Sequence, residues 1–192
     1  QFLQTNGSGV TSWAAAGGGG TWTILDTEEI SSAVGSVTMT GFTSCYDQFA
    51  MGISNLGSVA DGGEISLRVG CGSSCTGCNY QMVIKYWNAA AACLCGFQRA
   101  VTRDEILLNV NTGSASGESL GGMVYFHRAP DDCESNLTIT GQTSTLSNTG
   151  DHYMNVIGGI WKSSASYDRA IVTGISNNLD HGRITLWGIK HA

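Results

Sequence analysis

The sequence predicts an all-β protein, an antiparallel β-sandwich preceded by an extended N-terminal arm. Short runs of alternating apolar and polar residues recur along the chain, with turn residues between them. The 27 glycines contrast with a single proline, so the turns must rely on Gly, Asn, Ser and Asp. With 192 residues, one such domain can bury a sizeable core.

Residues 1–20 are expected to form the arm, and residues 21–192 the sandwich domain. The first twenty residues have no sustained apolar period and end in four glycines, which is typical of a linker. The chain begins at Gln1 rather than at Met, which predicts a processed product or a part of a longer protein.

Eleven strands are predicted after the arm, and the run from Glu64 to Val69 has the cleanest alternation, with Ile65, Leu67 and Val69 on one face. The predicted strands are Thr21–Leu25, Ser36–Gly41, Gln48–Ser54, Glu64–Val69, Tyr80–Trp87, Ile106–Asn111, Met123–His127, Leu137–Thr140, Tyr153–Ile160, Arg169–Ser176 and Arg183–Lys190. Two short stretches favour a helix, Thr27–Val34 and the Ala-rich Asn88–Ala92, so the helix content should be small.

The last two predicted strands are interpreted as a closing β-hairpin. Residues 177–182 between them include Asn, Asp and Gly, which tolerate the positive φ that turns need. Each strand has an apolar side to bury, formed by Ile171 and Ile175 in the first and by Ile184 and Leu186 in the second.

The charge pattern argues against nucleic acid as a partner. The net charge is −6, and the nine Lys and Arg residues are scattered rather than clustered. No apolar run is long enough for a membrane helix, so no membrane insertion is expected. Only 12% of the residues are charged, which favours a surface that is partly covered by neighbouring subunits.

Seven cysteines leave three alternatives open: reduced thiols, one or two disulfides, or a metal site. Cys71, Cys75 and Cys78, followed by Cys93 and Cys95, could offer thiolates to zinc, but only one pair has good knuckle spacing. We therefore expect no metal and no other cofactor, and either reduced cysteines or disulfides that hold the segment 70–96.

The most enzyme-like motif is Gly-Glu-Ser-Leu-Gly at residues 117–121, which matches the nucleophile elbow around Ser119. An elbow needs a helix after the serine, whereas a strand is predicted there. Partners in triad order are available in the sequence, but short motifs arise by chance in a Gly- and Ser-rich chain. We expect no catalytic residues; the available partners are Asp151, His152, Asp168 and His181.

Two further groups of polar residues are expected to be structural. Asp131, Asp132 and Glu134 follow Pro130 and are interpreted as turn chemistry rather than a calcium or glycosidase site. The four histidines lack the spacing of a metal motif and are not expected to be ligands; they are His127, His152, His181 and His191.

Five tryptophans supply either core mass or stacking faces for sugar rings. Trp13, Trp22, Trp87, Trp161 and Trp187 are expected mostly in the core or at a subunit interface. On a strand, Trp87 has the opposite phase to Tyr86, so one of the two should face outward.

The two ends of the chain resemble C-terminal domains of tailed-phage fibre and head-appendage proteins. Gln1–Trp13 is similar to the segment that leads into such domains, and Gly20–Leu25 to their first strand. Asp168–Ile171 resembles their penultimate strand, and Gly182–Ile189 matches their closing pattern Gly-x-Ile-x-Leu-aromatic-Gly-Ile. Together these segments cover about a quarter of the chain, whereas the Cys-rich segment from Cys71 to Cys95 departs from the pattern.

This resemblance implies a jelly-roll-like sandwich, a homotrimer, and a structural or receptor-binding role on the virion without catalysis. The protein would then be assembled in the host cytoplasm as a capsid- or tail-attached fibre or decoration protein. Its arm would bind other virion proteins, and its sandwich could contact a glycan or protein of the host surface. The alternative is a secreted carbohydrate-binding, lectin-like β-sandwich module, for which the aromatic residues and the sandwich would suffice.

Overall fold

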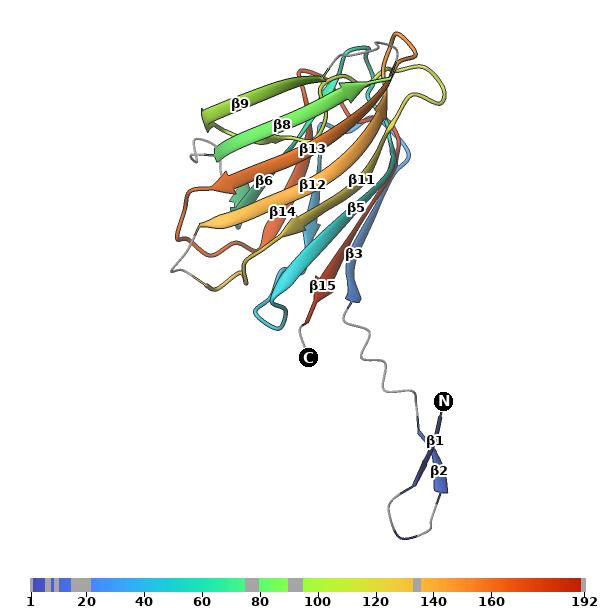
Figure 1. Ribbon diagram of the computed structural model, residues 1–192, viewed down its shortest axis with the longest axis vertical. Coiled ribbons are helices and arrows are strands. Elements are labelled where there is room, and N and C mark those ends of the chain that lie inside the picture. Colours follow the sequence, from blue (N-terminus) through green and yellow to red (C-terminus); the bar gives the residue numbers. More distant parts are fainter. Residues whose placement is uncertain are drawn as a thin grey trace.

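The computed structural model describes residues 2–5, 8, 11–14, 22–74, 80–89, 95–132 and 136–190. None of these residues lies in a helix, and two antiparallel sheets pack on each other as a sandwich (Figure 1). The all-β sandwich predicted from the sequence is therefore confirmed. In this part of the chain there is accordingly no helix that could cross a membrane.

The larger sheet has eight strands and curves across the front of Figure 1. Its order is β3 (Trp22–Ile30), β15 (Gly182–Ile189), β5 (Gln48–Leu56), β11 (Leu120–Phe126), β12 (Leu137–Leu146), β13 (His152–Trp161), β8 (Tyr80–Asn88) and β9 (Cys95–Arg103). Every neighbouring pair is antiparallel. Strands β3 and β9 are its two edges.

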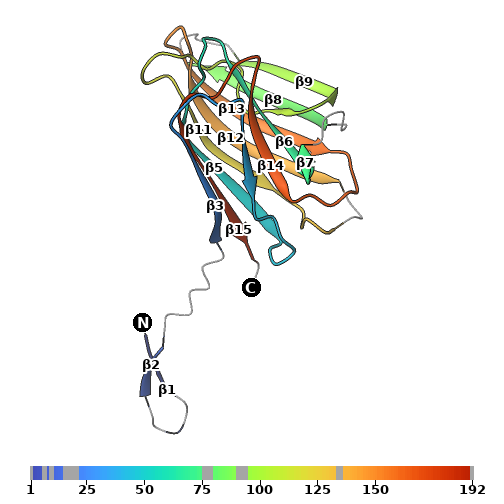
Figure 2. The same ribbon diagram turned by 180° about the vertical axis from the view of Figure 1, so that it is seen from behind.

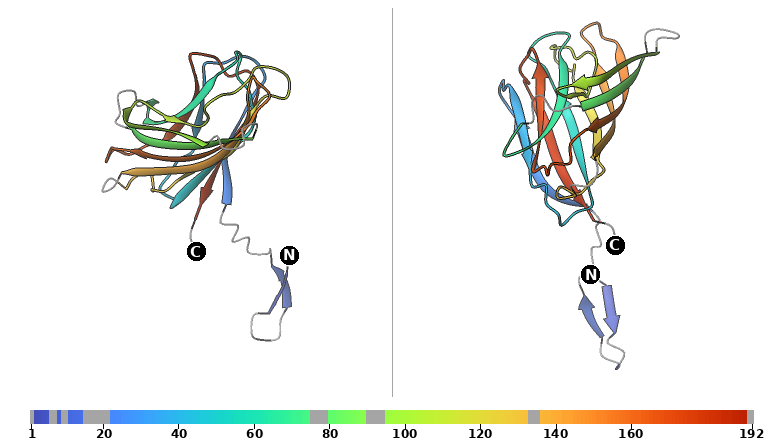
Figure 3. Two further views of the ribbon diagram at one scale, coloured as in Figure 1. Left: turned by 45° about the horizontal axis from the view of Figure 1, so that its top comes forward. Right: turned by 90° about the vertical axis from the view of Figure 1, so that its left-hand side faces the viewer.

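The smaller sheet covers one face of the larger one and is seen from outside in Figure 2. It contains β10 (Ile106–Leu107), β6 (Glu64–Cys71), β14 (Arg169–Ile175) and β4 (Ser36–Thr40), with β7 (Ser73–Ser74) paired to β6. Strand β3 begins and β15 ends at the same end of the sandwich (Figure 3). The strand order alone does not establish jelly-roll connections, which stay a prediction.

The core lies between the two sheets. Phe42 packs against Phe49, Phe126 and Tyr167, with ring centroids 4.7, 5.3 and 5.3 Å apart. Alternate residues of each large-sheet strand point into this space; in β12 these are Leu137 and Ile139, both fully buried. The period of two in the sequence thus selects the face that the small sheet covers.

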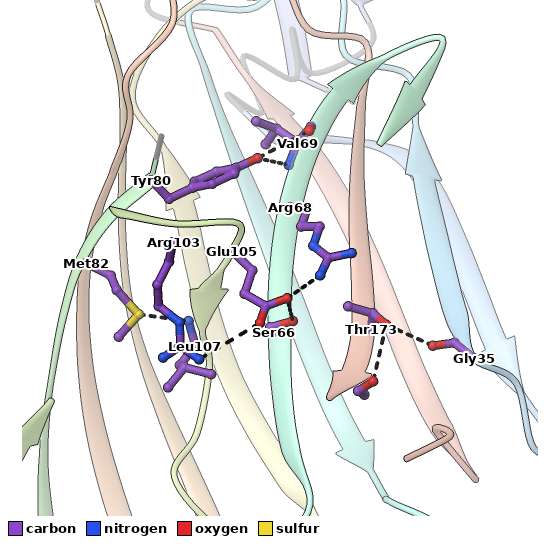
Figure 4. Close-up of polar contacts among 11 residues, drawn as sticks. Gly35, Ser66, Arg68, Val69, Tyr80, Met82, Arg103, Glu105, Leu107 and Thr173 are labelled. Carbon is purple, nitrogen blue, oxygen red and sulfur yellow. Dashed lines mark hydrogen bonds and ion pairs between the residues drawn. The ribbon is translucent and has the colours of Figure 1, made fainter. Parts of the chain in front are cut away.

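Polar contacts also join the two sheets (Figure 4). The Tyr80 hydroxyl of β8 accepts a hydrogen bond from the Val69 amide at 2.8 Å and lies 3.3 Å from the Val69 carbonyl. Glu105, just before β10, accepts hydrogen bonds from Arg68 at 2.5 Å and from Ser66 at 3.1 Å. The buried Glu105 carboxylate is thus paired and hydrogen-bonded, as buried charges must be.

The predicted closing hairpin is wrong, because its two strands lie in different sheets. Strand β14 pairs with β4 and β6, whereas β15 pairs with β3 and β5. Between them Leu179 forms bridges to Val34 and Ser58 and is fully buried. The apolar side predicted for the first strand is wrong as well, because Ala170 and Val172 of β14 face the core while Ile171 pairs with Arg68 on the opposite side. Ile184 and Leu186 of β15 face the core as predicted, and the intervening residues cross from one sheet to the other.

Both predicted helices are also contradicted where they are described. Thr27 to Ile30 continue β3, since pairing with β15 satisfies their backbone groups, and Val34 forms an isolated bridge. Asn88 ends β8, and residues 90–92 lie outside the described residues. No strand was predicted at the position of β9. The strand predicted from Ile106 ends four residues beyond the end of β10.

The arm contains more regular structure than expected. Strands β1 (Phe2–Thr5) and β2 (Thr11–Ala14) pair as a separate two-stranded antiparallel sheet. The glycines 17–20 lie outside the described residues. That the arm binds other proteins stays a prediction.

Candidate interaction surface

The residues weighed as a catalytic triad have other partners in the structure. Ser119 leads directly into β11, so the predicted strand context is confirmed and the helix of a nucleophile elbow does not follow. His152 contacts the Ser144 hydroxyl at 2.5 Å, and His181 contacts Asp180 at 3.2 Å. None of these contacts reaches Ser119.

The two remaining acids of that set are also engaged elsewhere. Asp168 binds Arg169 at 2.7 Å and accepts a hydrogen bond from the Gly72 amide. The contact with Arg169, supported by that of Gly72, lowers the pKa of the Asp168 carboxyl against an opposing effect of burial. Asp151 accepts hydrogen bonds from Thr149 and Asn88. Asp168 thus anchors the turn that follows β6.

Within the described ranges, no three His, Cys, Asp or Glu side chains cluster closely enough to hold a metal ion. Cys45 and Cys71 are exposed free thiols, whereas Cys75, Cys78, Cys93 and Cys133 lie outside the described residues, as does Glu134. The alternatives for the Cys-rich segment therefore stay predictions.

The outer face of the eight-stranded sheet, the face turned away from the small sheet, is the most distinctive surface. Register places its residues in rows that cross the sheet. One row runs from β3 to β8 through Ile24, Trp187, Ala50, Tyr125, Thr140, Gly158 and Val83. The next runs from β3 to β9 through Thr27, Thr185, Gly52, Met123, Gln142, Val156, Lys85 and Phe97.

Aromatic rings gather at the β3 end of this face. We define Trp22, Trp187, Tyr125 and His127 as the tryptophan cluster. The Trp22 ring lies 6.0 Å from that of Trp187 and 6.3 Å from that of Tyr125, and Tyr125 stacks on His127 at 6.3 Å. Beside it Ile24 is 65% exposed and Trp22 is 44% exposed. Such contiguous exposed apolar area marks an interaction site more often than a solvated surface.

The middle of the face is hollowed because its rows contain small residues. Two hollows of about 390 and 620 Å³ adjoin at Thr140. Gly122, Gly141 and Gly158 are among their lining residues, and the side chains around them are mainly apolar, including Met123 and Val156. Four outward positions of β12 carry a hydroxyl or an amide, at Thr138, Thr140, Gln142 and Ser144. The floor of the hollow is therefore mixed rather than purely apolar.

Exposed apolar residues return at the β9 end of the face. We define Val83, Trp87, Phe97 and Met154 as the β8–β9 patch; they are 47%, 39%, 68% and 43% exposed. The Lys85 ammonium lies 4.9 Å from the centre of the Trp87 ring. Trp87 is thus the outward member of the Tyr86–Trp87 pair, as its phase on a strand predicted.

The tryptophans divide between the core and the outer face, and whether the latter form a subunit interface stays a prediction. Trp161 is buried, whereas Trp22, Trp87 and Trp187 lie on the outer face. The Trp187 ring covers Gly52, where a Cβ would lie 2.7 Å from a ring atom. Of its two predicted places, core or subunit contact, the core is therefore wrong. The side chain of Trp13 lies outside the described residues.

The ends of the outer face also differ in charge. At the β3 end Glu29 has the outward phase, whereas Asp26 and Glu28 have the phase of the buried Ile30. At the β8 end the outward charged residue is Lys85.

No known protein family, curated protein or solved structure matches the chain. A function can therefore be inferred only from the outer face of the large sheet and from the sequence.

Proposed function

We propose that this chain is a non-enzymatic structural protein of a tailed-phage virion, a capsid- or tail-attached fibre or decoration protein that works as a homotrimer. Self-association is supported by the outer face of the large sheet, which has exposed apolar residues at both ends. Its assignment to a virion rests on the resemblance of the two chain ends to phage appendage domains. A jelly-roll connection of the strands is part of the same proposal.

Subunit contact accounts for this face better than solvent does. An outward strand face in water normally carries polar residues at alternate positions, as β12 does with Thr138 and Thr140. Strand β8 instead presents Val83 and Trp87 outward. Burying such side chains contributes a free energy of roughly 25 cal/mol per Å² of apolar area, which would stabilise contact with a neighbouring subunit.

Self-association is tested by native mass spectrometry and sedimentation velocity of the purified chain at micromolar concentration. We expect a trimer that dissociates on dilution. A chain that stays monomeric at 100-fold higher concentration would contradict the proposal. Mass spectrometry of purified virions should detect the chain, and its absence from them would remove the virion assignment.

The second candidate function is a carbohydrate-binding module. The tryptophan cluster borders a floor of Thr140 and Gln142, and aromatic faces beside hydroxyl and amide groups suit sugar rings. A glycan array separates the two functions. Strong binding by a monomer, lost in Trp22→Ala but kept in Phe97→Ala, would favour the module over the trimer.

An enzymatic role is tested at Ser119. We propose no catalysis, so esterase assays with short acyl esters should give no signal above buffer. A signal abolished by Ser119→Ala would overturn this part of the proposal.

A further inference from the structure

We propose that strand β3 of one subunit packs against the hollow and the β8–β9 patch of a second copy of this chain. The inference rests on the self-association proposed above and names the two surfaces that meet. It also predicts which residues lie within contact distance across the interface.

The two surfaces have complementary shapes. Ile24 and Trp22 form an exposed apolar ridge on edge strand β3. The hollow beside the β8–β9 patch is low because Gly158 has no side chain between Thr140 and Val83. A ridge of one copy can therefore enter the hollow of another, and such close packing is what gives an interface core its stability.

Both apolar ends of the outer face are exposed within the described residues of one subunit. Ile24 and Phe97, the two most exposed large apolar side chains in the described ranges, lie on β3 and β9. These strands are the opposite edges of one sheet, so they cannot cover each other within a subunit. In an assembly of two copies, the β9 end of one subunit can cover the β3 end of the other.

The two surfaces also differ in charge. A contact of β3 with β3 through the outer face would bring Glu29 against the same carboxylate, whereas a contact of β3 with β8 and β9 brings Glu29 toward Lys85. Arg183 pairs with Glu29 at 3.1 Å, but both side chains are largely exposed, so solvent screens this pair. Complementary charges favour the unlike contact and suppress the like one.

The contact joins two different surfaces. Each subunit therefore binds one neighbour through β3 and the other neighbour through the hollow and the β8–β9 patch. A head-to-tail contact of this kind closes into a ring when the rotation between subunits fits. The proposed trimer is one such ring. Each outer face would then be covered at both ends, at β3 by one neighbour and at β8 and β9 by the other.

Photo-crosslinking tests the pairing directly. A benzophenone amino acid replaces Phe97 in one preparation, which is mixed with an equal amount of isotope-labelled unmodified chain and then re-equilibrated. We expect crosslinks from position 97 to labelled peptides that contain residues 22–30. Crosslinks only to other surfaces, or only to the same position of another copy, would overturn the inference.

Charge reversal provides an independent test. The single variants Glu29→Lys and Lys85→Glu should each weaken trimer formation at least tenfold by sedimentation velocity. Combining both substitutions should restore assembly to within about threefold of the original chain. Asp131→Lys, an exposed reversal in a turn outside both surfaces, is the matched control and should leave assembly unchanged.

The outcomes separate this inference from the proposed function. A stable trimer that ignores all these substitutions would refute the pairing of β3 with β8 and β9 while leaving the homotrimer intact. A monomer at every concentration would refute both. Circular dichroism of each variant excludes unfolding as the cause, since all substituted positions are exposed.

Discussion

The two faces of the large sheet are built from the same strands but differ in what covers them. On the inner face, Tyr80, Met82 and Ile84 of β8 are buried under the small sheet. On the outer face of the same strand, Val83 and Trp87 remain 47% and 39% exposed. The small sheet of the same chain covers the inner face, whereas apolar residues of the outer face stay exposed. Exposed apolar residues on the second side of this strand are the basis for the proposed contact with another subunit.

The largest test of this comparison removes one phenylalanine from each face. Phe126 is fully buried against Phe42, so Phe126→Ala should lower the free energy of unfolding by about 3–5 kcal/mol. Phe97→Ala, at a position 68% exposed, should change the stability of the monomer by less than about 0.5 kcal/mol. Urea denaturation of monomeric protein measures both, and equal losses would contradict the division into a covered and an uncovered face.

Alkaline pH probes the inner face alone. Burial raises the pKa of Tyr80 to about 12, against a smaller opposing effect of its hydrogen bond with Val69, and burial also raises the pKa of Tyr167. The folded chain holds the phenol protons more tightly than the unfolded chain, whose tyrosines titrate near pH 10. Stability should thus be complete below pH 10 and fall as the pH rises through 12.

The magnitude for Tyr80 follows from the size of the shift. One pKa unit corresponds to about 1.4 kcal/mol, so its contribution to the alkaline loss is on the order of 2–3 kcal/mol. Thermal melts between pH 8 and 12 should show a shallower decline in Tyr80→Phe than in the original chain. An unchanged slope would show that Tyr80 is not the buried phenol responsible.

Two glycines of the large sheet, Gly122 with inward phase and Gly158 with outward phase, distinguish a position that requires glycine from an open one. At Gly122, with φ at +155°, a Cβ would lie 2.2 Å from the Gln142 carbonyl oxygen, so Gly122→Ala should cost about 1–3 kcal/mol. At Gly158 a Cβ would meet Val83 at an ordinary 3.4 Å, so Gly158→Ala should leave stability nearly unchanged. Chemical denaturation compares the pair, and a larger loss at Gly158 would contradict the presence of open space there.

The smallest expected effect concerns Lys85. Its ammonium lies 4.9 Å from the centre of the exposed Trp87 ring, an arrangement worth about 0.5–1 kcal/mol at a surface. Lys85→Gln should lower monomer stability by no more than that. Measuring the same variant in the assembled state sharpens the comparison, because a contact that excludes water should make the loss larger. An equal loss in both states would argue against burial of Lys85 on assembly.

Local pattern predicted most of the strands but not their partners. The alternation of Glu64 to Val69 identified β6, because every second residue there meets the core. The helix predicted from Thr27 was wrong, since a short polar run is compatible with either a helix or a strand. Pairing with β15 decides that Thr27 to Ile30 form a strand. Strand β9 was missed because its sequence, with Gly96 and Gln98 at inward positions, lacks a clear apolar alternation.

The candidate surface was predictable only in part. The phase of Trp87 relative to Tyr86 indicated that one of them faces outward, and the low charge of the chain indicated a covered surface. Register alone could bring Trp22, Tyr125 and Trp187 together, because they lie on three strands far apart in the sequence. No local motif encodes such a contact.

The sequence by itself determined the all-β class and most strand positions, because alternation and turn residues act within a few neighbouring residues. The tertiary structure decided that β14 and β15 part into separate sheets, although their short connection resembles a hairpin. Each strand joins the sheet where its backbone bonds and apolar face are both satisfied, at β4 and β6 for one and at β3 and β5 for the other. The same long-range pairing placed Trp187 on the outer face, beside the hollow where we infer that a second copy packs.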